Sequence, residues 1–131
     1  AAGVEVEREA AERAERLPDR ERKRVERDAK DDAKRAIRRQ RTASLDAALR
    51  LTGLWFRDVA SVLIGGDALL HHADRDEQLR TDAASVGDPH RLLACVDLVD
   101  ATRRSLRLNA TEDLQLDALS VRLRSALHPG R

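Results

Sequence analysis

Apolar residues between Ser44 and Gly66 recur three and four positions apart, which is the spacing of one face of a helix. The residues on this face are Leu45, Leu49, Thr52, Phe56, Val59 and Leu63. A second row widens the stripe to roughly half of the circumference, and it consists of Ala48, Leu51, Trp55 and Val62. A stripe this wide predicts a core helix that contacts two neighbours, with Phe56 fully buried at its centre.

Polar and glycine residues define the limits of this helix. The side opposite the stripe carries Asp46, Arg50, Arg57 and Ser61. Gly65-Gly66 predicts the C-terminus, because glycine adopts the left-handed conformation without a Cβ penalty.

The stretch before this stripe is dominated by charged residues of both signs, with sparse small apolar residues at helical spacing. Pro18 predicts a break, since proline disfavours helix in the preceding residue. From Asp19 the pattern favours one continuous helix up to Gly65. The alternative is a second helix that begins at Thr42 or Ser44, either of which could act as an N-cap.

The remaining pattern predicts a turn or short helical piece over 67–74 and then three helices. These cover about 75–86, 88–108 and 112–127, separated by Gly87 and by a segment that resembles a capping box, Asn109 to Glu112. Asp88-Pro89 is a strong start signal, an N-cap acid followed by proline in the first helical position. The sequence therefore predicts an all-α fold, a bundle of about four to five helices with a long, highly charged N-terminal helix. Residues 1–41 form the charged helical extension or linker, and residues 42–131 form the bundle.

Composition supports this prediction and limits the partners. Aromatic residues make up 2% of the chain and charged residues 37%, so the core must be aliphatic. The net charge of +1 provides no overall field to attract nucleic acid or an anionic membrane.

The single cysteine, Cys95, excludes an internal disulfide and is expected to be a small core residue in a reducing compartment. No apolar run approaches the roughly 20 residues that span a bilayer, so a cytoplasmic protein is expected.

Residues that could carry catalysis or bind a cofactor do not form a recognisable pattern. The chain lacks a glycine-rich phosphate loop between a strand and a helix, and no serine has the glycine neighbours of a nucleophile elbow. His71-His72 with Asp74 resembles a metal set only superficially, since adjacent histidines diverge by about 100° on a helix. We therefore expect no enzymatic activity, no ATP turnover, no cofactor or metal, and no small-molecule substrate.

One run of cations contains no acid. It comprises Lys34, Arg35, Arg38, Arg39 and Arg41. A solvated helix face is the favoured interpretation, because acids lie one to two turns upstream and no aromatic residue is interleaved for base stacking. The alternative is weak contact with the phosphates of DNA or RNA.

Three stretches, in order and spacing, resemble one protein family. The first runs from Arg35 through Leu45-Asp46-Ala47-Ala48-Leu49 to Leu54-Trp55-Phe56-Arg57-Asp58-Val59, the second is Leu70-His71-His72-Ala73-Asp74, and the third is Leu108-Asn109 followed by Leu114 to Leu119 and Leu123. Together they resemble the C-terminal domain of the bacterial DNA polymerase III delta-prime subunit, a component of the sliding-clamp loader. The chain departs from the family over residues 1–34 and at Ala110-Thr111-Glu112.

The resemblance implies a helical domain without a nucleotide site that forms a collar with the corresponding domains of other clamp-loader subunits. The implied function is a non-catalytic oligomerisation or scaffold domain that supports clamp loading in DNA replication. Candidate interface residues are Leu51, Trp55 and Val62. Trp55 has two interpretations: another helix of the same bundle covers it, or it is partly exposed and the next subunit covers it. The alternative function is a stand-alone helical nucleic-acid-binding module that uses the basic run 34–41.

Overall fold

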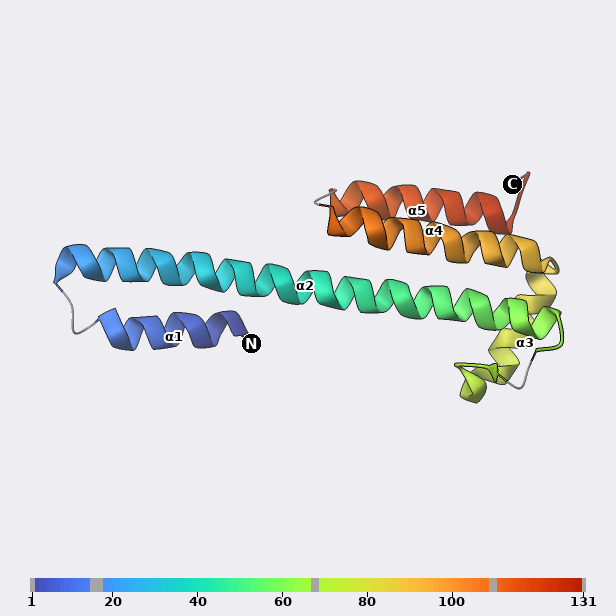
Figure 1. The fold of residues 1–131 in the computed structure, drawn as a ribbon, viewed down its shortest axis with the longest axis horizontal. Coiled ribbons are helices and arrows are strands. Elements are labelled where there is room, and N and C mark those ends of the chain that lie inside the picture. Colours follow the sequence, from blue (N-terminus) through green and yellow to red (C-terminus); the bar gives the residue numbers. More distant parts are fainter. Residues whose placement is uncertain (1, 15–17, 67–68, 109–110, 131) are drawn as a thin grey trace. The chain divides into compact units, whose positions relative to one another are not determined.

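The computed structural model describes residues 2–14, 18–66, 69–108 and 111–130 of the 131-residue chain. Its elements in order are α1 (Ala2–Ala14), α2 (Asp19–Leu63), the 3-10 turn η2 (Ala73–Arg75), α3 (Asp76–Val86), α4 (Pro89–Arg107) and α5 (Glu112–Leu127) (Figure 1). None of the described segments is a strand, so the predicted all-α class is confirmed.

Helix α2 is continuous from Asp19 to Leu63, as the favoured interpretation predicted. Thr42 lies inside it, and its hydroxyl donates to the carbonyl of Arg38 at 3.0 Å instead of capping a new helix. The helix ends at the predicted glycines. Gly65 has a φ of 80°, its N–H donates to Val62, and the N–H of Gly66 donates to Ser61. These two bonds form a Schellman motif, which satisfies carbonyls that the helix end would otherwise leave unpaired.

The chain divides into two compact units, Ala1–Leu45 and Asp46–Arg131, and each is described separately. In the first unit, α1 lies against the N-terminal part of α2 through small residues. Gly3, Ala29 and Ala33 are buried there. A Cβ atom on Gly3 would lie 2.9 Å from Cδ1 of Ile37, so the lack of a side chain allows the close approach of α1.

The second unit contains the main core, built from α2, α3 and α4. The fully buried cluster consists of Val59, Ala60, Leu79, Ala83 and Leu92, and half-buried residues including Trp55, Phe56 and Leu127 pack against it. Helices α4 and α5 run antiparallel beside each other (Figure 1). Gly53 of α2 faces Val99 of α4, where an added Cβ would be 3.6 Å from the valine. Cys95 is completely buried, which confirms its predicted place in the core.

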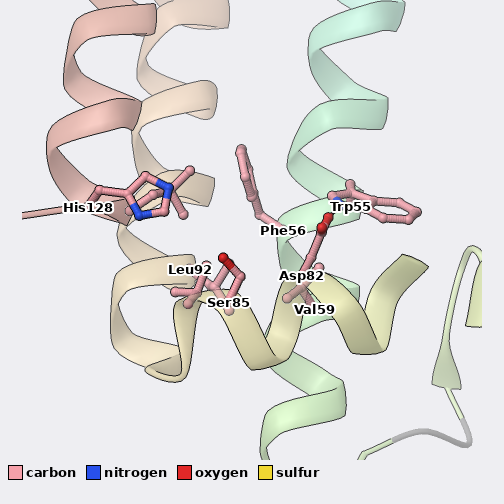
Figure 2. Close-up of a pocket in the computed structure, with 9 residues that line it drawn as sticks. Trp55, Phe56, Val59, Asp82, Ser85, Leu92 and His128 are labelled. Atoms are coloured by element: carbon pink, nitrogen blue, oxygen red, sulfur yellow. Dashed lines mark hydrogen bonds between the residues drawn. The ribbon is translucent and has the colours of Figure 1, made fainter. Parts of the chain in front are cut away.

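The predicted apolar face of α2 does point toward the core, but its residues are less buried than expected. Leu49 and Val59 are buried, but Leu45, Thr52 and Leu63 are half-buried. Phe56 was expected to be fully buried, and this prediction is wrong. The ring lines a cleft between α2, α3, α4 and the end of α5 (Figure 2), and it is half-buried because one side of it faces this cleft.

The helix starts agree in part with the sequence signals. Asp88 is the N-cap of α4, its carboxylate accepts from the N–H of His90 at 2.9 Å, and Pro89 is the first helical residue, as predicted. Thr111 is at the N-cap position of α5, but its side chain makes no capping hydrogen bond. Asn109, the other predicted cap, is outside the described residues.

The different burial of Phe56 and Leu79 predicts an order of mutational effects. Leu79 is fully buried in the core cluster, so Leu79→Ala should cost about 3–4 kcal/mol through lost transfer energy and a cavity. Phe56→Ala removes more atoms, but these already face the open cleft, and we expect a smaller loss of about 2 kcal/mol. Urea unfolding followed by circular dichroism measures both losses. A larger loss for Phe56→Ala would mean that the cleft is closed in solution.

Candidate functional site

The most strongly constrained polar group in the described structure is the carboxylate of Asp58, on α2. Its side chain is 1% exposed, although it is charged. Four hydrogen bonds from the turn at His71 and His72 surround it. Oδ1 accepts from the backbone N–H of His71 at 3.1 Å, and Oδ2 accepts from the backbone N–H of His72 at 2.7 Å. The turn between α2 and η2 is therefore fastened to the helix by one side chain.

The two histidine rings complete the arrangement. Nδ1 of His71 is 3.0 Å from Oδ1, and Nδ1 of His72 is 2.8 Å from Oδ2. An ionised carboxylate can only accept hydrogen bonds, so each Nδ1 must carry a hydrogen. Both nitrogens are thus used as donors to Asp58, and neither offers a lone pair to a metal. Across the described residues, no group of three or more His, Cys, Asp or Glu side chains is placed to hold a metal ion.

Two opposing effects set the pKa of Asp58. Burial raises it, while the backbone and ring hydrogen bonds from His71 and His72 lower it, and the net result is a pKa of about 2. The carboxylate is therefore ionised near neutral pH despite its burial. The difference from the ordinary value of 3.8 corresponds to roughly 2 kcal/mol of folding stability.

Trp55 extends this network to α3. Its indole Nε1 donates to Oδ2 of Asp82 at 2.8 Å, a contact visible in Figure 2. Its ring meets that of His72 edge to face, with centroids 5.3 Å apart and an interplanar angle of 68°. Trp55 and Asp58 are neighbouring positions on one side of α2, so this short stretch holds both the turn and α3.

The predicted interface residues differ in exposure. Leu51 is 52% exposed, while Trp55 and Val62 are half-buried and pack against the core cluster. Trp55 fits parts of both interpretations, because α3 and the turn contact it and part of the ring stays accessible. Its contact with a partner subunit stays a prediction.

The cleft beside Phe56 is small. It has a volume of about 180 Å³ and is lined by residues from α2, α3 and α4 and from the end of α5 (Figure 2). Typical small-molecule sites have volumes of roughly 300–1,000 Å³. The cleft is therefore a poor match to a cofactor or substrate site.

The predicted basic run lies on α2 within the first unit. Lys34, Arg35, Arg38, Arg39 and Arg41 are all exposed. They do not form one surface. At 100° per residue Lys34 and Arg38 lie close together, while Arg39 is rotated roughly 140° from Lys34. Arg35 is paired with Asp32 at 2.9 Å.

The sequence pattern did not predict that the carboxylates of Asp58 and Asp46 accept hydrogen bonds from distant parts of the chain. Asp46 was assigned to the solvent side, but it accepts two hydrogen bonds from Arg103 of α4, at 2.9 and 3.1 Å. The hydrogen bond from Arg103 lowers the pKa of Asp46, and its effect exceeds the opposing effect of burial. The available signal for Asp58 was an acid on the margin of an apolar stripe, followed after a glycine turn by two histidines.

Comparisons with protein-family models, with curated proteins and with solved structures find no significant match. Within the described segments, no helix is both long and apolar enough to cross a membrane.

Replacing Asp58 with asparagine tests how strongly the turn depends on this carboxylate. The substituted amide would present N–H donors to backbone N–H groups that need an acceptor, so Asp58→Asn should cost about 2–4 kcal/mol. Asp82→Asn is the matched control, because Asp82 is exposed and an amide oxygen can still accept from Trp55. We expect the control to lose less than about 1 kcal/mol in urea unfolding. Equal losses would contradict the central position of Asp58.

The pKa of Asp58 also predicts an acid dependence. Because the folded-state value of about 2 lies below the ordinary 3.8, the unfolded chain binds this proton first as the pH falls. The stabilisation is complete above about pH 4 and is lost as the pH approaches about 2. The difference in unfolding free energy between the wild type and Asp58→Asn should therefore shrink over this range. A difference that stays constant down to about pH 2 would show that the charge of Asp58 contributes nothing.

Proposed function

We propose that the unit Asp46–Arg131 is a non-catalytic assembly domain of a DNA polymerase III clamp-loader subunit, which associates with other subunits through a helical collar. The observation that carries this proposal is the joining of two of the three stretches that resemble the delta-prime family. The Trp55-Phe56-Arg57-Asp58 segment and the His71-His72 link are bonded to each other through Asp58. The two segments therefore contact each other directly. This contact favours the interpretation that the chain shares the fold of the delta-prime C-terminal domain, rather than resembling its sequence by chance.

Exposed apolar side chains support association. Leu51 is 52% exposed on α2, and Leu114 and Val121 are each 67% exposed on α5. The last two are seven residues apart and lie on the same face of their helix. A scaffold domain buries such side chains against its partners, and their removal from water contributes about 25 cal/mol for each Å² of apolar surface.

The accessible edge of Trp55 is the best candidate for the centre of the interface. Large aromatic residues often dominate binding because they bury much surface with little loss of side-chain freedom. Asp82 and His72 already hold the ring in one orientation. A preorganised ring beside the exposed Leu51 would dock without a further ordering cost.

Association with the other clamp-loader subunits of the same organism tests the proposal. We expect the chain to form a stable complex in size-exclusion chromatography with light scattering, and the emission of Trp55, the single tryptophan, to change on binding. Leu51→Ser should weaken the complex about tenfold, since a buried leucine contributes roughly 1.5–3 kcal/mol. The matched control is Leu93→Ser on α4, where the leucine is 47% exposed.

The control should change the affinity less than about threefold. If the wild type fails to associate, or if both variants weaken the complex equally while circular dichroism shows intact folding, the proposed interface is wrong.

A further inference from the structure

Helix α2 carries a row of cations that is longer than the run seen in the sequence. We name it the basic stripe, and its members, spaced three and four residues apart, are Arg20, Lys23, Arg27, Lys30, Lys34 and Arg38. At 100° per residue they fall within about 80° of the helix circumference and extend over about 27 Å. All six side chains are exposed.

The charges of the stripe are available to a partner. Among the described residues, no ion pair involves any member of the stripe. The acids nearest in rotation, Asp19, Glu26 and Asp31, lie outside its sector, and Asp19 and Asp31 are each about 20° beyond an edge. Arg41 continues the spacing, but it already takes part in an interaction within the chain and is not counted.

The packing of the first unit leaves this face uncovered. Helix α1 covers the side of α2 that contains Ala29 and Ala33, which are 8% and 2% exposed. These alanines are rotated by roughly 100–140° from Lys34, at the centre of the stripe. The contact between α1 and α2 therefore holds the helix while its cationic face stays open to solvent.

We propose that the basic stripe binds the phosphate backbone of a nucleic-acid duplex without reading its sequence. A row of exposed cations along one helix face can contact successive phosphates of a duplex, and each neutralised phosphate releases condensed counterions, which drives binding. The proposal goes beyond the assembly function, which concerns the other unit. It also changes the residues expected from the sequence, since Arg35 and Arg39 lie outside the stripe.

The surroundings of the stripe favour a duplex over a membrane. A helix that lies on a membrane places Trp, Phe or Leu beside its cations so that they enter the acyl boundary. The margins of the stripe carry acids and one exposed apolar residue, Ile37, and Ala29 and Ala33 are buried under α1. One isoleucine among acids does not make the apolar face that enters the acyl boundary. Single strands are disfavoured as well, because binding them relies on aromatic residues that stack with bases. The only Trp and Phe of the chain are Trp55 and Phe56, in the other unit.

Fluorescence anisotropy with the full chain and labelled DNA and RNA duplexes of mixed sequence, each about 24 bp long, tests this proposal. Binding should weaken as salt rises from about 50 to about 200 mM, with a log-log slope of about −5 if all six cations contact phosphates. Binding of either duplex supports the proposal. The duplex that binds with higher affinity shows whether the natural partner is DNA or RNA. No binding of either duplex at about 50 mM salt and about 20 µM protein would overturn it.

Two triple variants with the same loss of charge separate the stripe from general attraction. The stripe variant is Arg20→Gln/Arg27→Gln/Arg38→Gln, and the control is Arg8→Gln/Arg39→Gln/Arg57→Gln, which changes three exposed arginines outside the stripe. Glutamine is nearly as good a helix former as arginine, so both should keep the helicity of the wild type in circular dichroism. We expect the stripe variant to bind at least about 30-fold more weakly, with a slope shallower by roughly 3, and the control to change less than about threefold.

Three further outcomes would overturn the proposal. They are an equal loss of affinity in both variants, tighter binding to single-stranded oligo(dT) of the same length than to the duplexes, and binding to phosphatidylserine vesicles that exceeds binding to the duplexes at the same salt.

Discussion

The hydrogen bonds around Asp58 are the interaction on which the second unit depends most. A single buried carboxylate accepts the backbone N–H groups of two successive residues and the rings of the same two residues. Burial of a charge is costly unless hydrogen bonds replace its hydration. Here all four donors come from one turn, so the charge can be buried only when that turn is folded against α2.

This constraint positions the elements that follow. The turn is continuous with η2 and α3, and α3 contributes Leu79 and Ala83 to the core and Asp82 to the bond with Trp55. The pair between Asp46 and Arg103 fixes α4 to the same segment of α2 at a second point. Apolar contacts supply most of the stabilisation of such a core, but they are non-directional. The two carboxylates add direction, since each accepts hydrogen bonds in one geometry only.

The two units present different surfaces. The described part of Ala1–Leu45 exposes a row of cations together with Val4 and Ile37 and buries alanine and glycine. The unit Asp46–Arg131 exposes leucine and valine on α2, α4 and α5 beside an aliphatic core. The net charge of +1 does not reveal the row of cations. Acids and bases that are mixed along the sequence can still lie on different faces of a helix. The proposed assembly surface in one unit and the proposed electrostatic surface in the other are therefore compatible within one short chain.

The sequence by itself determined the helices and their ends. Periodicity, Pro18, the glycines and Asp88-Pro89 act over a few residues, so local rules were sufficient for the all-α class, the continuous α2 and the start of α4. The core position of Cys95 followed from the chemistry of a lone cysteine in an apolar helix. Tertiary structure alone decided the depth of burial and the polar contacts. Phe56 proved half-buried because one side of its ring faces a cleft, and Asp58 and Asp46 found donors 13 and 57 residues away. A pattern along the chain shows which side of a helix is apolar, but only the packed chain brings distant donors to a charge and makes its burial stable.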